Sequence, residues 1–126
     1  MTQTLDQKRA KFAWEAARRA IVDIKNFSDY KNLAKGAPAL IMGNGLMPAL
    51  AFYKSRGKKH ATQLMQDILD WQARSIPNAN NAQTLTFEAA MQAMQSENSI
   101  AYMRRTDEAL AMLKWLRQFA VSVSAS

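Results

Sequence analysis

The sequence predicts an all-α protein, a compact bundle of about six helices that form a single domain over residues 1–126. Ala, Met, Gln, Lys and Arg are frequent, whereas the chain has only four glycines and three prolines. Unbranched side chains lose little rotamer freedom in a helix, so this composition favours helices. No segment sustains the apolar–polar alternation of a strand. A chain of this length buries roughly 65–70% of its unfolded surface, enough for one core without disulfides or metal.

The first helix is predicted from Thr4 to about Lys25, because apolar side chains recur there at helical spacing. Its predicted buried face consists of Ala10, Ala13, Trp14, Ala17, Ala20, Ile21 and Ile24. The segment 26–28 interrupts the pattern, and Asp29 is the predicted cap of the second helix. The apolar face of this second helix consists of Tyr30, Leu33, Ala34, Ala37 and Leu40.

Prolines and glycines divide the next segment. Pro38 is expected to kink the second helix, because proline lacks an N–H and clashes with the preceding turn, and Gly43 is expected to end it. The third helix is predicted over residues 46–55, with Asn44 or Gly45 as its cap, Pro48 in or near its first turn and Gly57 at its end. Residues 36–53 are uncharged, but these helix breakers would strand backbone groups in a membrane, so buried helices are expected instead of a span.

The fourth helix is predicted from Lys58 to Ser75. Its inward side chains are expected to be Ala61, Leu64, Met65, Ile68 and Trp71. Its outward side chains are expected to be Gln63, Gln66, Asp67, Asp70 and Arg74. The proline and three asparagines of residues 77–81 predict a loop between the two halves of the chain, too short for an inter-domain linker.

Two more helices are predicted after this loop. The fifth carries Phe87, Ala90, Met91 and Met94 on one side. The sixth and longest covers about residues 99–121, and residues 122–126 are expected to be a frayed tail. The central stripe of the sixth helix is predicted to be Met103, Leu110, Leu113, Leu116 and Ala120, flanked by Tyr102, Met112 and Phe119.

The composition argues against catalysis, metal and cofactors. The chain has no cysteine and one histidine, which excludes thiolate zinc sites, iron–sulfur clusters and multi-histidine metal sites. His60 is read as a residue exposed at a helix end, and Asp67 with Asp70 as solvated surface instead of a magnesium half-site. Asp107 and Glu108 are expected to pair along their own helix with Arg104, Arg105 and Lys114. No catalytic residue, metal ligand or cofactor is therefore predicted.

The basic residues carry the positive prediction. The formal net charge is +7, and residues 31–59 hold six basic side chains and no acidic one. Such a balance favours polyanionic partners. The predicted RNA-binding residues are Lys54, Arg56, Lys58 and Lys59 at the turn between the third and fourth helices, with the pairs Arg18-Arg19 and Arg104-Arg105 on the first and last helices. If those two helices are neighbours, the pairs could extend one stripe along a nucleic-acid backbone. The contacts would be to phosphate and therefore weakly sequence-specific.

Several short strings, taken together and in order, resemble a known family. They are Ala37-Pro38-Ala39-Leu40-Ile41, Asn44-Gly45-Leu46, Ala49-Leu50-Ala51-Phe52, Tyr102-Met103-Arg104-Arg105, Glu108-Ala109-Leu110-Ala111, Leu113, Trp115-Leu116 and Phe119-Ala120. With the opening Arg9-Ala10-Lys11-Phe12-Ala13, they are similar to the small helical subunit of type III-B CRISPR effector complexes, the Cmr complex. One departure is Met42-Gly43, where members often carry a basic residue and a threonine before Asn-Gly.

The resemblance implies a bundle of about six helices with no catalytic activity of its own. It implies several copies that stack into a short filament beside the backbone subunits that hold the guide RNA, and that help to line the groove for the complementary target RNA. The implied partners are the backbone and large subunits of the complex, guide RNA and target RNA. Weak self-stacking is expected to use Met-rich and Trp115-containing surfaces. The first nine residues lack the apolar stretch of a secretory signal, so a cytoplasmic protein without membrane contact is expected.

Three alternatives remain open on the residues alone. The first is a free-standing helical adaptor that binds an acidic protein partner without RNA. The second is a metal-dependent nuclease that uses Asp67 and Asp70. The third is a helix-turn-helix DNA-binding protein around Gly57, which the acidic outer face expected for the following helix disfavours.

Overall fold

A computed structural model describes residues 2–77 and 81–125, and over these residues the chain forms six α-helices and no strand. The helices are α1 (Leu5–Asp23), α2 (Phe27–Asn44), α3 (Leu46–Arg56), α4 (Lys59–Ser75), α5 (Phe87–Ser96) and α6 (Ser99–Val123). The predicted all-α class with about six helices is confirmed. In the described part of the chain, no helix is both long and apolar enough to cross a membrane.

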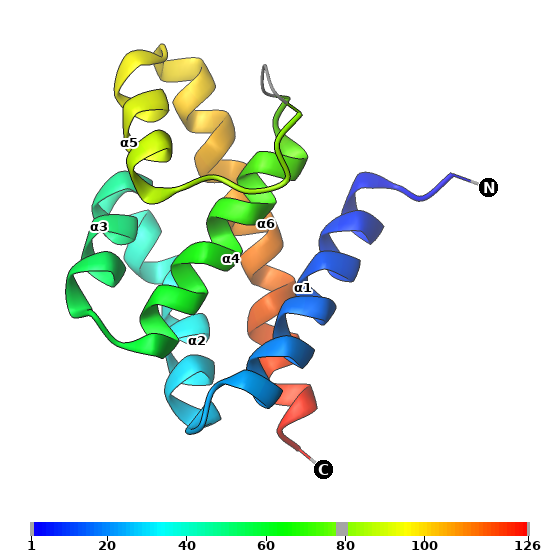
Figure 1. The fold of residues 1–126 in the computed structure, drawn as a ribbon. Helices are drawn as coiled ribbons and strands as arrows, with labels where there is room; N and C mark the ends of the chain where they lie inside the picture. The colour runs from blue at the N-terminus through cyan, green and yellow to red at the C-terminus, as the bar shows by residue number, and fades with distance from the viewer. Residues whose placement is uncertain (1, 78–80, 126) are drawn as a thin grey trace.

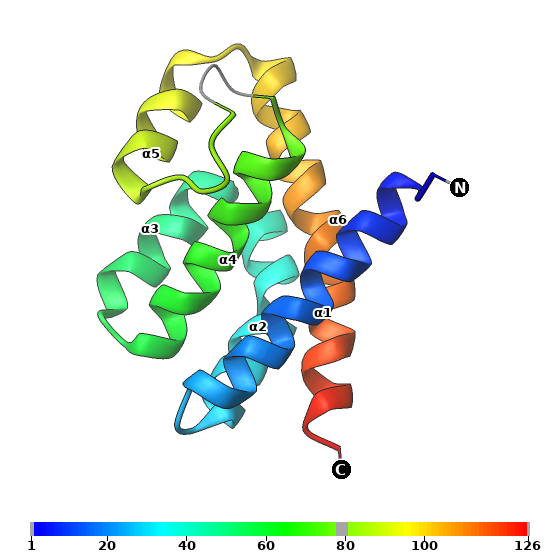
Figure 2. The same ribbon diagram turned by 45° about the vertical axis from the view of Figure 1, so that its right-hand side comes forward.

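The helices surround α4, which lies in the middle of the bundle (Figure 1). α1 and α6 run side by side, and the second view shows the same pairing with α3 and α5 on the opposite side of α4 (Figure 2). Alanines permit the close approach of α1, since Ala13, Ala16, Ala17 and Ala20 are at most 1% exposed. α4 is buried around most of its circumference, as Leu69, Gln72 and Ala73 are covered in addition to the predicted inward residues.

Local sequence signals account for most helix ends. Thr4 and Gln7 form a reciprocal capping box at the start of α1. Thr86 and Asn98 cap α5 and α6 by accepting hydrogen bonds from backbone amides. Gly57 ends α3 with φ of 65°, the left-handed conformation that favours glycine.

Three predicted boundaries differ. Asp29 is not the cap of α2, because the helix starts at Phe27 and Asn26 occupies the cap position without a side-chain hydrogen bond. α2 contains Pro38 within it, as expected, but it continues one residue past the predicted end at Gly43 and ends at Asn44. α6 extends to Val123, two residues into the predicted tail.

The predicted helix faces also need corrections. Trp14 is 41% exposed and Met103 61% exposed, although both were expected on inward stripes. The buried face of α1 is rotated by about one residue, because Phe12 packs against Trp71 of α4 with ring centroids 5.2 Å apart. Asp67, expected on the outer face of α4, is fully buried.

The connection from α4 to α5 is longer than the predicted loop. Of residues 77–81, positions 78–80 lie outside the described residues, and the non-helical segment continues to Thr86. Gln66 of α4 holds it by donating to the hydroxyl of Thr84 at 3.0 Å and to the carbonyl of Leu85 at 2.9 Å. Thr84 also donates to Asp70, so the outward face of α4 carries this segment and is not simply solvated.

Candidate nucleic-acid interface

The turn between α3 and α4 presents four cations to solvent. Lys54, Arg56, Lys58 and Lys59 are all exposed, as the sequence predicts. The tight bend at Gly57 places the last turn of α3 next to the first turn of α4. Two of the cations lie over aromatic rings: Arg56 is 5.6 Å from the Phe52 ring centroid, and Lys54 is 5.9 Å from that of Phe87.

The start of α4 adds its own positive potential. The cap residue Lys58 makes no side-chain hydrogen bond to the first amides of the helix. The N-terminal end of a helix carries partial positive charge, and its free amides favour anions such as phosphate. Together with the four cations, which we call the basic turn, the start of α4 concentrates positive charge at this end of the molecule.

The basic turn also contacts the end of α1. Lys59 donates from Nζ to the carbonyl oxygen of Asp23 at 3.0 Å, which satisfies an acceptor in the last turn of α1. Arg19, one turn earlier in α1, lies 3.4 Å from the Asp67 carboxylate and keeps a half-exposed side chain. Arg19 therefore lies on the side of α1 that faces α4, whereas Arg18 lies 5.8 Å over the ring of Trp14, which contacts Phe119 of α6.

The structure does not bring Arg18-Arg19 and Arg104-Arg105 into one stripe. Glu108 fixes Arg9 beside α6, Arg18 lies nine residues further along α1, and Arg104 lies four residues before Glu108. Because α1 and α6 run in the same direction (Figure 1), these two offsets add, and at 1.5 Å per helical residue the two arginine pairs are roughly 20 Å apart along the helices. Arg105 is moreover engaged with Glu97, with its Nε 2.5 Å from the carboxylate oxygen. α1 and α6 are neighbours, but the pairs lie at different ends of their contact.

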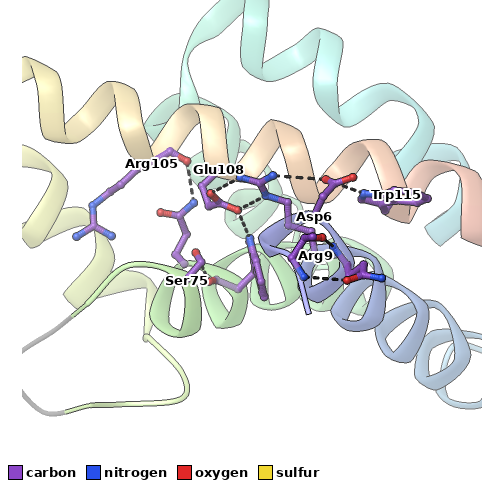
Figure 3. Close-up of polar contacts among 10 residues, drawn as sticks. Asp6, Arg9, Ser75, Arg105, Glu108 and Trp115 are labelled. Atoms are coloured by element: carbon purple, nitrogen blue, oxygen red, sulfur yellow. Dashed lines mark hydrogen bonds and ion pairs between the residues drawn. The ribbon is translucent and has the colours of Figure 1, made fainter. Parts of the chain in front are cut away.

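A polar network locks α1, α4 and α6 together on the side shown in Figure 3. Glu108 accepts from Nε and Nη2 of Arg9 at 2.7 and 2.9 Å, and from the indole N–H of Trp71 at 2.9 Å. The hydrogen bonds and charge of Arg9 lower the pKa of Glu108 despite its burial. Glu108 thus pairs across helices, not along its own helix as predicted, and Asp107 remains exposed. Asp6 extends the network by accepting from Trp115 at 3.1 Å, which lowers the pKa of Asp6.

A second polar cluster surrounds the buried Asp67, which the sequence reading missed. Its carboxylate accepts from the Tyr30 hydroxyl at 2.6 Å, from Gln63 at 2.9 Å and from Arg19 at 3.4 Å. Burial raises the pKa of Asp67 to about 6, although these three donors act in the opposite direction. No local signal in α4 marks position 67, because Asp67 and Leu69 lie on opposite sides of Ile68 around the helix; Asp67 is buried by the neighbouring helices that carry Tyr30 and Arg19.

The remaining candidate groups are engaged in structural contacts. His60 is partly buried and its Nδ1 lies 3.9 Å from the Asp29 carboxylate. Asp70 accepts from Gln66 at 2.9 Å as well as from Thr84. Within residues 2–77 and 81–125, no three His, Asp or Glu side chains gather as a group that could hold a metal ion.

Comparison with known proteins decides the family. The sequence profile described as CRISPR-associated protein (Cas_Cmr5) matches residues 5–123, nearly the whole described chain. The chain belongs to the Cmr5 family.

Two matches from Thermus thermophilus illustrate how similar this Cmr5-family chain is to its relatives. The protein named "CRISPR system Cmr subunit Cmr5" is 32% identical over 122 residues, which cover 94% of each chain. The crystal structure of a CRISPR-associated Cmr5 family protein from the same organism superposes with a TM-score of 0.77 at 28% identity, over 96% of this chain and 97% of that one. The resemblance noted in the sequence and the helical fold that it implied are confirmed.

Proposed function

We propose that this chain is a non-catalytic subunit of a type III-B CRISPR ribonucleoprotein effector complex that acts in antiviral defence in the cytoplasm. It stacks beside the backbone subunits and uses its basic surface to help hold the duplex of guide RNA and target RNA. The name of the Thermus relative, a Cmr subunit, supports membership of such a complex, because the likeness covers 94% of both chains.

The basic turn is the observation that carries the RNA-binding part of the proposal. Its four cations are exposed, and the segment from Lys31 to Lys59 contains no acidic residue. Arg19 adds a half-exposed cation on the adjoining end of α1. We propose Arg18, Arg104 and Arg105 as separate and weaker phosphate contacts, since Arg18 lies over an indole and Arg105 is paired with Glu97.

The engagement of the acidic groups supports a role without catalysis. A general acid or base needs a proton-transfer partner within hydrogen-bond reach in a plausible substrate pose. Asp67 is fully buried among its donors, and Glu108 is bound by Arg9 and Trp71. Asp70, the second carboxylate of the nuclease alternative, holds the segment before α5. We propose that the assembled complex obtains its chemistry from other subunits.

The test replaces the four residues of the basic turn with alanine in the reconstituted complex. The variant is expected to bind duplex RNA more weakly and to flatten the dependence of log affinity on log salt by up to about 3–4 units, since each lost phosphate contact removes roughly 0.7–0.9. Filter binding over a salt series measures both quantities. An unchanged salt slope would reject the four residues as phosphate contacts, and no retention of RNA by the wild type at low salt would favour the adaptor alternative.

A matched pair of double variants controls for total charge. Lys58→Ala/Lys59→Ala and Lys8→Ala/Lys11→Ala each remove two exposed cations, but the second pair lies on the N-terminal half of α1. Only the first pair is expected to reduce the salt slope. Equal reductions would show that net charge, not the basic turn, determines RNA affinity.

Self-stacking forms a separate part of the proposal. Ile100 and Met103 lie three positions apart on α6, and their apolar side chains are 79% and 61% exposed, which are large exposed fractions for such residues. The ring of Trp115, by contrast, stacks on Phe119 and donates to Asp6 within the chain. Light scattering is expected to show an average mass that rises above 14.2 kDa with concentration, and Ile100→Asp/Met103→Asp is expected to suppress the rise. A mass that stays at 14.2 kDa for the wild type at every concentration would contradict stacking of the isolated chain.

A further inference from the structure

A groove between α2 and α6 lies outside the basic turn and is not used by the proposed RNA contact. It has a volume of about 520 Å³. Its lining consists of Lys35, Pro38, Met42, Leu110, Lys114, Arg117, Gln118 and Val121. The α2 residues are spaced by three and four positions, and the α6 residues by one, three or four, so each set lies on one helix face.

The groove follows about three turns of α6. Its lining on α6 extends from Leu110 to Val121, which corresponds to roughly 16 Å at 1.5 Å per residue. Two helices that lie side by side leave a furrow into which the side chains of a third helix can pack. The shape therefore fits a short helical segment.

The charges of the groove select an acidic occupant. Lys35, Lys114 and Arg117 are exposed, and none of the described lining residues is acidic. Carboxylates placed opposite these cations would gain complementary electrostatic interactions, which steer association and fix orientation.

The aliphatic floor of the groove favours an acidic protein segment over RNA as its occupant. Pro38, Leu110 and Val121 supply aliphatic surface, and Met42 adds a side chain that is 73% exposed. Methionine is flexible and adapts to apolar partners. A phosphate backbone, which is the part of RNA that the basic turn would contact, would leave this aliphatic surface exposed to water. Aliphatic side chains on one face of a helix would cover the floor instead.

We propose that the α2–α6 groove binds an acidic amphipathic helix of a protein partner. Leucine-type side chains of that helix lie on the aliphatic floor, and its carboxylates face Lys35, Lys114 and Arg117. This docking surface goes beyond the RNA-binding function and does not depend on it, because it lies on helices α2 and α6, apart from the turn between α3 and α4.

The experiment selects peptides from a randomised phage-displayed library on the full-length chain. The enriched peptides are expected to be rich in Asp and Glu, with aliphatic residues spaced by three and four positions. The strongest peptide, labelled with fluorescein, is then measured by anisotropy against variants. Lys35→Glu/Arg117→Glu is expected to weaken the affinity of this peptide by about tenfold or more, because carboxylates of like charge would then face each other across the interface. Met42→Asp tests the aliphatic floor and is expected to weaken the affinity of the same peptide.

The control reverses the same number of charges elsewhere. Lys8→Glu/Lys11→Glu lies on exposed positions of α1 and is expected to leave the peptide affinity within about twofold. Failure to enrich acidic peptides, or equal losses in both double variants, would overturn the proposal. So would a loss of duplex-RNA affinity in Lys35→Glu/Arg117→Glu as large as that caused by the alanine variant of the basic turn. The alanine variant is expected to bind the peptide normally, so failure of the RNA function and failure of the groove are distinguishable.

Discussion

Replacing Asp67 with alanine is expected to lower the free energy of unfolding by about 2–3 kcal/mol, because it leaves a buried donor without its acceptor. The Tyr30 hydroxyl is fully buried, and the Asp67 carboxylate accepts its hydrogen bond at 2.6 Å. Arg19 also loses its partner, but that side chain is half-exposed and water replaces the contact at little cost. Urea unfolding followed by circular dichroism measures the change, which is large against a typical stability of about 5–15 kcal/mol.

Two further variants separate this cause from a general loss of charge. Asp107→Ala removes an exposed carboxylate of α6 and is expected to change stability by less than about 0.5 kcal/mol. Tyr30→Phe removes the hydroxyl that Asp67→Ala would leave without an acceptor. Adding Asp67→Ala to the Tyr30→Phe variant is therefore expected to lower the free energy of unfolding by less than in the wild type. Equal costs of Asp67→Ala in both backgrounds, or a cost no larger than that of Asp107→Ala, would show that the hydrogen bond does not stabilise the fold.

The pH dependence of stability tests the same carboxyl without removing its volume. Burial raises the pKa of Asp67 to about 6 from its ordinary value of 3.8, so folding favours the protonated form. The resulting stability is fully present below pH 3.8 and is lost as the pH rises through about 6. Between pH 5 and 7 the wild type is expected to lose about 1.4 kcal/mol relative to Asp67→Asn. The lowered pKa values of Asp6 and Glu108 act only at lower pH, where their stabilisation is lost. A constant difference between wild type and Asp67→Asn across this window would contradict the assignment.

Helix patterns predicted the fold well because helix ends and apolar spacing are local properties. Thr4, Asn98 and Gly57 act through residues within one turn, so their signals can be read from the sequence. The burial of Asp67 and the exposure of Trp14 depend instead on which helices lie beside α4 and α1. Such neighbours are set by packing over long sequence separations, and local spacing does not specify them.

The candidate interface likewise contains some cations whose placement the sequence predicts and others whose placement depends on packing. The basic turn was predictable because its four cations are close in sequence around one glycine. The fate of the arginine pairs was not, since Arg19 meets Asp67 forty-eight residues away. Arg105 meets Glu97 only eight residues away, but across the start of α6, where the N-cap Asn98 reverses the chain. Charge counts alone do not show which cations are already engaged within the fold.

Glu108→Ala is expected to destabilise the protein by about 2–3 kcal/mol, because three donors from two other helices lose one acceptor. The bidentate contact with Arg9 is the strongest type of charged hydrogen bond, and both side chains are mostly buried, at 20% and 12% exposed. The indole N–H of Trp71 loses its acceptor too. Glu108→Gln keeps an acceptor for Trp71 but removes the charge, so its cost is expected to lie between that of alanine and zero. Thermal unfolding by circular dichroism orders the three proteins.

A double-mutant cycle with Arg9→Ala tests whether the Arg9–Glu108 contact carries this cost. A coupling energy of at least about 1 kcal/mol is expected for a close and mostly buried pair, and additive losses would contradict it. The same variants test the independence of stability and RNA binding. Glu108 lies at the end of the α1–α6 contact away from Asp23, which is where Lys59 joins α1 to the basic turn. Loosening the Arg9 contact therefore leaves the cations of the turn in place, and folded Glu108→Ala is expected to keep its duplex-RNA affinity within about twofold. A large loss of affinity in the folded variant would mean that the orientation of α1 against α6, and not the basic turn alone, shapes the surface that RNA contacts.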